Sequence, residues 1–101
     1  MKKTVELSTK KKVDIREMSI DEVDFCQDLI VTDIVDGKVT NVRNMAKART
    51  AWLRRGIEGG DFKAYKKDSD GYPVDAVLKQ LTEEEKNELY TLIQDYQNMG
   101  E

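Results

Sequence analysis

Two acidic stretches are the first places in this sequence where side chains could hold a metal ion or exchange protons. In KDSDGYPVDAV, aligning Gly71 with the glycine of a calcium-binding loop places Asp68 and Asp70 at ligand positions three and five. Position one is then Lys66, and position twelve is Val77, where a calcium loop needs a bidentate glutamate. These two mismatches favour a simple turn over a calcium site.

The second acidic stretch is Glu83–Glu85, directly after a predicted helix cap at Thr82. Carboxylates in a first helical turn stabilise the positive end of the helix dipole, so we interpret them as structural rather than as general acids or bases. The sequence has no histidine, which excludes Ser–His and Cys–His nucleophile pairs and His-containing metal sites. The one cysteine, Cys26, is on an apolar helix side and is expected to be a buried, unreactive thiol. We therefore predict that the protein is not an enzyme and uses no cofactor or metal.

The basic run RNMAKARTAWLRR, residues 43–55, provides the remaining candidate site. In one interpretation, Arg43, Lys47, Arg54 and Arg55 follow a phosphate backbone while Trp52 stacks on a base. In the other, Trp52 belongs to the core and the cations lie on a solvated face near acidic neighbours. The acidic segments on both sides of the run favour the second interpretation. We take the four cations as candidate partner-binding residues and do not expect nucleic-acid binding.

The composition indicates one small, polar domain. With 101 residues, the chain is expected to form a single domain, 1–101, around one modest core. Apolar residues make up 39% and charged residues 37%, which is polar but sufficient for a core. No apolar run approaches the roughly 18 residues of a membrane span, and MKKTVELS lacks the apolar stretch of a signal peptide. With one cysteine the chain can form no internal disulfide, so a cytoplasmic location is expected. Since no apolar run could span a bilayer, no membrane association is expected.

Charge alternates along the chain in four blocks. Residues 1–12 carry five lysines against one glutamate, and residues 13–36 carry eight acids against one arginine. Residues 37–67 carry nine bases against two acids, and residues 68–101 carry nine acids against two lysines. Blocks of opposite sign can pair inside one fold or between copies of the chain, so self-association is expected. The net charge of −3 also disfavours a nucleic-acid binder.

Alternating apolar residues predict a β-hairpin within residues 1–18. Its strands are TVELS and KVDIRE, separated by the polar TKKK. Ser19 and Glu22 then match a capping box, in which each side chain bonds a backbone N–H that the first helical turn leaves unpaired. An apolar stripe that begins at Ile20 and is widened by Phe25, Cys26 and Leu29 predicts the first helix from about residue 20 to 32.

The middle of the chain is less strongly patterned. Asp36-Gly37 between β-branched residues is a turn signal, so residues 33–42 form either a second small hairpin or a loop, and we favour the loop. Strong helix formers predict a helix over residues 41–58, which Gly59-Gly60 would end. A polar loop is expected near residues 59–72.

The last third of the chain is predicted to be helical. Pro73 can begin a short helix that runs to about residue 80, and Thr82 with Glu85 forms a second capping box. An apolar stripe then predicts a helix to about residue 97. The expected fold is therefore α+β and mainly α, with an N-terminal β-hairpin followed by about three helices that form a helical body over residues 19–101.

The segment VELSTKKKVDIREMSIDEVD resembles the start of the tail assembly chaperones of long-tailed bacteriophages. In that family a short strand, a basic turn and an I-R-E-M segment often precede a mostly helical body. The similarity covers residues 4–25 best and extends more loosely over the helical remainder.

This resemblance implies a non-enzymatic role in the host cytoplasm. Such chaperones coat the long helical tape-measure protein, keep it soluble and recruit tail-tube protein to polymerise around it. The expected partners are therefore the tape-measure protein, the tail-tube protein and further copies of the chain. The alternatives are a small nucleic-acid-binding regulator that uses the basic helix 43–55, or a structural component of the phage head–tail junction.

Overall fold

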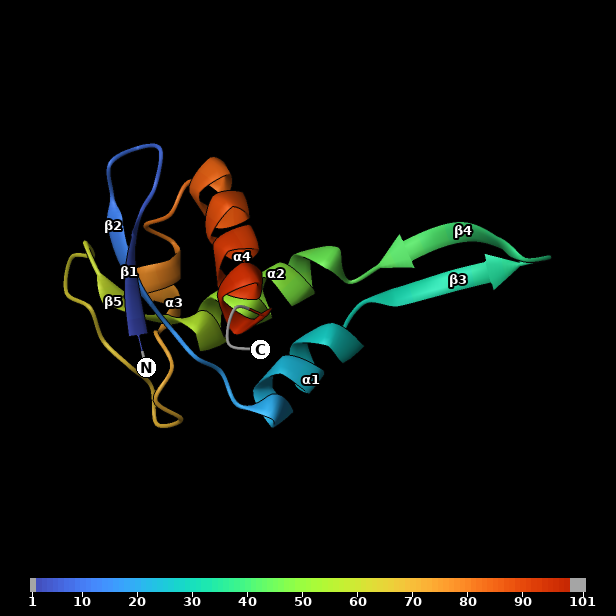
Figure 1. Ribbon diagram of the computed structural model, residues 1–101, viewed down its shortest axis with the longest axis horizontal. Coiled ribbons are helices and arrows are strands. Elements are labelled where there is room, and N and C mark those ends of the chain that lie inside the picture. The colour runs from blue at the N-terminus through green and yellow to red at the C-terminus, as the bar shows by residue number, and fades with distance from the viewer. Residues whose placement is uncertain (1, 99–101) are drawn as a thin grey trace.

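The computed structural model describes residues 2–98 as a body from which one β-hairpin projects (Figure 1). The molecule measures 49 × 29 × 29 Å, and the projecting hairpin lies along the long dimension. The body contains a three-stranded sheet and four helices. The predicted α+β class is confirmed, although strands form a larger part of the chain than predicted.

The N-terminal hairpin is confirmed as strands β1 (Lys2–Glu6) and β2 (Lys12–Arg16), which pair antiparallel. A third strand, β5 (Ile57–Gly60), pairs antiparallel with the other edge of β2. Two-stranded hairpins are marginally stable in water, and a third strand removes that weakness. The side chains of Val13 and Ile15 in this central strand are fully buried.

Strand β5 shows that the prediction for Gly59-Gly60 was wrong. Helix α2 (Met45–Gly56) ends earlier, and Ile57 already has extended backbone with φ −87° and ψ 127°. The backbone turns at this point because Ile57 is buried opposite Ile15 of β2, a contact between residues far apart in sequence. Helix α2 also begins at Met45 instead of residue 41, since the preceding residues belong to a strand.

Helices α2 and α4 (Glu83–Asn98) pack against each other and together supply Ala51, Trp52, Leu53, Leu89 and Ile93 to the core. Figure 1 shows the two helices beside the sheet. Trp52 is 3% exposed, which confirms its predicted place in the core. The second capping box is also confirmed: the Thr82 N–H donates to Glu85 Oε1 at 2.8 Å, and the Glu85 N–H donates to Thr82 Oγ1 at 3.1 Å. The predicted short helix before it is α3 (Asp75–Leu78). The core consists of Val5, Leu7, Val13, Ile15, Met18, Cys26, Ala51, Trp52, Leu53, Ile57, Leu78, Leu81, Leu89 and Ile93.

Helix α1 (Ile20–Asp28) begins at the predicted capping box of Ser19 and Glu22. It ends at Asp28 instead of residue 32, because the β-branched residues that follow enter a strand. The predicted apolar stripe is buried only in part: Cys26 is fully buried, whereas Ile20 is 79% exposed.

The expectation of a loop at residues 33–42 was wrong. Strands β3 (Val31–Val35) and β4 (Lys38–Arg43) form a second antiparallel hairpin, which we call the arm, residues 31–43. Asp36 and Gly37 have φ of 51° and 76°, the two positive values that a type I′ hairpin turn requires. The Asp-Gly turn signal was therefore sufficient to join the two β-branched runs.

The charge blocks pair inside the fold, as the sequence allowed. Lys11 of the first block lies 3.7 Å from Glu85 of the last, and Arg49 of the third block lies 2.8 Å from Glu83. Arg54 also pairs with Asp75. Two of the nine bases in the third block thus pair with the acidic fourth block.

The close approach of β5 to β2 predicts opposite outcomes for two adjacent glycines. Gly60 has φ 129°, and an added Cβ would lie 2.5 Å from Lys12 O and 2.7 Å from Val13 Cα. Gly60→Ala should therefore lower the free energy of unfolding by about 2–4 kcal/mol through backbone strain and steric overlap. Gly59→Ala is the matched control, since its Cβ would meet only Asp14 Oδ2 at 3.4 Å. Urea unfolding followed by Trp52 fluorescence measures both, and equal losses in the two variants would contradict the β2–β5 register.

Candidate functional site

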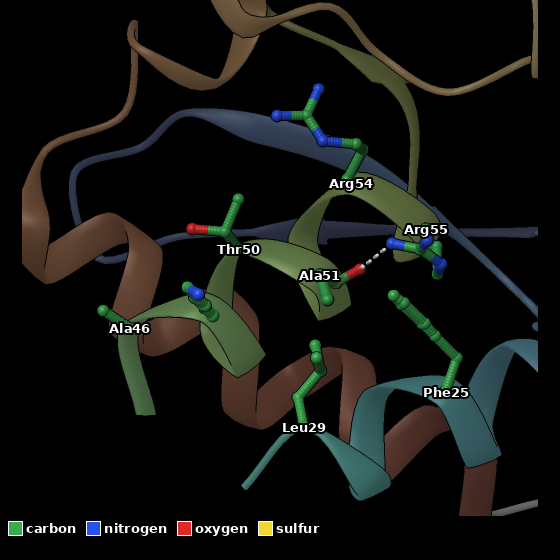
Figure 2. Close-up of a pocket in the computed structure, with 8 residues that line it drawn as sticks. Phe25, Leu29, Ala46, Thr50, Ala51, Arg54 and Arg55 are labelled. Carbon is green, nitrogen blue, oxygen red and sulfur yellow. Dashed lines mark hydrogen bonds between the residues drawn. The ribbon is translucent and has the colours of Figure 1, made fainter. Parts of the chain in front are cut away.

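An open apolar groove lies between helices α1 and α2, at the base of the arm. It has a volume of about 440 Å³. Figure 2 shows Leu29, the residue after α1, pointing towards Ala51 of α2, and the Phe25 ring of α1 lying beside Arg55. Ala46 and Thr50 of α2 also line the groove. Phe25 is 41% exposed, so a large aromatic ring meets solvent where a core would normally cover it. The small residues on the α2 side leave room for another chain to approach.

Three cations line the same groove, each held differently. The Arg55 guanidinium lies 4.1 Å from the centre of the Phe25 ring and 5.0 Å from that of Tyr72, so it is stabilised by cation–π contacts on both. Arg54 is neutralised by Asp75 and also donates to Pro73 O at 2.8 Å. Lys47 is exposed and pairs with no carboxylate among residues 2–98. The groove therefore offers two cations, Lys47 and Arg55, without a carboxylate partner in the described part of the chain.

The four candidate partner-binding residues do not form one surface. Lys47, Arg54 and Arg55 line the groove, whereas Arg43 lies in the arm and pairs with Asp33 at 3.1 Å. Trp52 is buried and cannot stack on a base, and the rings beside these cations, Phe25 and Tyr72, are both in cation–π contact with Arg55. Sequence reasoning missed the exposure of Phe25, because it assigned that ring to the widened apolar stripe of a longer helix.

A polar network around Glu22 fixes the position of α1, and with it one wall of the groove. Arg16 Nη1 and Nη2 of β2 donate to the two Glu22 oxygens at 3.1 and 3.2 Å. Tyr72 Oη donates to Glu22 Oε2 at 2.8 Å, and the Ser19 N–H donates to Oε1 at 2.9 Å. Arg16 also donates to Arg55 O at 2.7 Å, which connects the network to the end of α2. Burial alone would raise the pKa of Glu22, but the hydrogen bonds from Arg16, Ser19 and Tyr72 outweigh it and lower that pKa to about 2.

The other residues considered for chemistry have structural roles. Cys26 is fully buried as predicted, and burial raises the pKa of its thiol to about 11. Asp68 accepts the N–H groups of Asp70 and Tyr72 at 2.9 and 3.1 Å, which makes the stretch that resembled a calcium loop a turn. Within residues 2–98, His, Cys, Asp and Glu side chains form no group of three that could hold a metal ion. The same residues contain no helix that is both long and apolar enough to cross a membrane.

No family model, curated protein or solved structure matches this chain. The groove and the arm are therefore the features from which a function can be argued.

The Glu22 network predicts a specific loss of stability in acid. Because the folded-state pKa of about 2 lies below the ordinary value of 4.5, Glu22 stabilises the fold above pH 4.5, and this contribution is lost as the pH falls towards 2. Glu22→Gln should lower the free energy of unfolding by roughly 1–3 kcal/mol at neutral pH, because the Arg16 guanidinium loses the carboxylate that accepts its hydrogen bonds.

Urea unfolding at about pH 7, 5 and 3 would show this difference shrinking in the most acidic sample. Glu17→Gln is the control, since Glu17 is exposed and makes no ion pair or side-chain hydrogen bond among residues 2–98. A difference between Glu22→Gln and wild type that stays constant with pH would contradict the network.

Proposed function

We propose that this protein is a non-enzymatic binding protein whose groove between α1 and α2 holds an amphipathic helix of a client protein. The exposed Phe25 ring, in a groove that the small residues Ala46 and Ala51 also line, is the observation that supports this proposal most strongly. An apolar groove of this kind suits the helix-in-groove mode, in which side chains at i, i+3 or i+4, and i+7 are buried together. The groove is too open to enclose a small substrate in the way most enzyme pockets do.

The charge around the groove specifies which helix would fit best. Lys47 and Arg55 have no carboxylate partner in residues 2–98, so acidic residues that flank the client's apolar stripe would form ion pairs with them. Complementary charges of this kind raise the association rate and the specificity for a partner more than they raise the binding affinity. A few apolar side chains and two charges without a carboxylate partner would give weak, reversible binding, which suits a protein that must release its client.

The resemblance to phage tail assembly chaperones suggests the identity of the client. We propose that the helical client is a tape-measure protein, held soluble in the host cytoplasm until tail-tube protein polymerises around it. A groove that accepts an acidic amphipathic helix fits this role, because a tape measure presents many helical segments along its length. The nucleic-acid alternative loses Trp52 as a stacking ring, since it is buried, and two of its four cations, Arg43 and Arg54, are paired with Asp33 and Asp75.

Model peptides test this proposal without knowledge of the natural client. The probe is a fluorescein-labelled helical peptide of about three turns with leucines on one stripe and glutamates beside them, compared with the same stripe flanked by lysines. By fluorescence anisotropy, the acidic peptide should bind the wild-type protein at least about tenfold more tightly than the basic one.

Two alanine substitutions separate the groove from the rest of the surface. Ala46→Glu places a carboxylate in the groove and should weaken binding of the acidic peptide by about tenfold or more. Ala76→Glu is matched to it, because both alanines are exposed second residues of their helices, and it should bind like wild type. Equal affinities in the two variants would contradict the groove as the binding site. A labelled DNA duplex that binds more tightly than the acidic peptide would favour the nucleic-acid alternative.

A further inference from the structure

The arm exposes apolar side chains that the rest of the described chain leaves uncovered. In the register of the hairpin, Ile34 pairs with Val39 and Thr32 pairs with Val42. Thr32 and Ile34 are two residues apart in β3 and lie on one face of the arm, and their partners Val42 and Val39 share that face. Val39 and Val42 are three residues apart because the register shifts between Asp33 and Ile34, which leaves Thr40 as an extra residue in β4. Ile34 is 64% exposed, Val39 62% and Val42 42%. We call the surface of Thr32, Ile34, Val39 and Val42 the apolar arm face.

The opposite face of the arm differs in chemistry. It carries Asp33 and Arg43, which form an ion pair at 3.1 Å, and Val35 beside the turn. In the register of the hairpin this face holds Val31 and Val35 among four polar or charged residues, whereas the apolar arm face holds three β-branched apolar residues and one threonine. An antiparallel sheet with one more apolar face commonly has that face covered. The body does not cover it, because the arm projects away from the helices (Figure 1).

The stability of the arm requires a partner for this face. An isolated two-stranded hairpin is marginal in water unless a further strand or another element packs on it. The N-terminal hairpin obtains that cover from β5 and the helices, whereas the arm obtains none from the described residues. The β-branched residues Ile34, Val39 and Val42 are already restricted in χ1, so covering them costs little side-chain entropy.

Charge indicates which partner covers the arm. Residues 31–43 carry two acids, Asp33 and Asp36, and two bases, Lys38 and Arg43, so the arm has no net charge. A nucleic acid or an anionic membrane would require a basic excess, and a strongly charged protein would require a complementary one. A second copy of the same arm requires neither a basic excess nor a complementary charge, because two arms without net charge can pack without repulsion. It is also present wherever the chain is present.

We propose that two copies of this protein associate by packing their apolar arm faces against each other about a two-fold axis. The contact is isologous, so Ile34 and Val39 of each copy meet the same surface on the other. This association involves the arm rather than the groove, so it holds or fails independently of the proposed client.

The size of the arm sets the strength of this contact. Each strand has five or six residues, which at roughly 3.4 Å per residue gives an arm about 17–20 Å long and only two strands wide. Such a face buries well below the roughly 800 Å² per partner of a standard protein interface. We therefore expect a reversible dimer with a Kd in the micromolar range or weaker. Because the arm has no net charge, we also expect added salt to change the dimer Kd little.

Two valines beside the turn provide a matched test. Val39, 62% exposed, is on the apolar arm face, whereas Val35, 57% exposed, is on the opposite face. Changing either to Thr keeps the β-branched shape and the strand propensity while adding a hydroxyl. In sedimentation velocity of the full chain from about 5 to 500 µM, wild type and Val35→Thr should show the same monomer–dimer equilibrium. Val39→Thr should raise the dimer Kd several-fold, and Ile34→Thr/Val39→Thr by about tenfold or more.

Thermal melts of each variant at low concentration show whether the body remains folded. We expect it to, because these substitutions change none of its core residues. Three results would overturn the proposal. The first is a wild-type protein that stays monomeric at the highest concentration. The second is an equal effect of Val35→Thr and Val39→Thr. The third is association that disappears steeply with added salt or continues past the dimer, which would indicate contacts between charge blocks or between open strand edges.

Discussion

The carboxylate of Glu22 is the polar contact on which the arrangement of the functional surface depends. It accepts hydrogen bonds from Arg16 of the sheet, from the Ser19 N–H at the start of α1, and from Tyr72, fifty residues further along the chain. Through Arg16 the same network reaches the end of α2. Because α1 buries only Cys26 fully, this polar anchor holds the helix in place where apolar packing is sparse. The angle of α1 then determines both the width of the groove and the direction in which the arm leaves the body.

The apolar residues are divided between the fold and the surface. The sheet, α2 and α4 bury a compact set that includes Trp52, Leu89 and Ile93, and these residues account for the stability of the body. Phe25, together with the apolar arm face, remains exposed although the chain is small and has few large apolar residues available. These exposed apolar groups lie on two adjacent features, and they are the basis on which we propose two partners, a client helix for the groove and a second copy for the arm.

Local signals in the sequence were enough to predict the elements that depend on local physics. Both capping boxes, the N-terminal hairpin and the burial of Trp52 and Cys26 follow from short patterns, and the structure confirms them. Strand β5 was missed because IEGG has no strand pattern of its own; it becomes a strand by pairing with β2. The arm was missed because a turn signal between β-branched residues fits either a loop or a hairpin, and β4 was read as the start of a helix. The groove depends on the distance between two helices and on where α1 stops, neither of which is encoded in a short window.

Hydrogen exchange of the full-length protein at two concentrations tests most directly whether the exposed arm is an interaction surface. If two arms cover each other, protection of the amides in residues 31–43 should rise clearly between about 5 and 500 µM protein, while protection in β1, β2 and β5 stays the same. The body then serves as an internal control, because its strands are covered within one chain. Arm amides that are equally protected, or equally unprotected, at both concentrations would contradict the account.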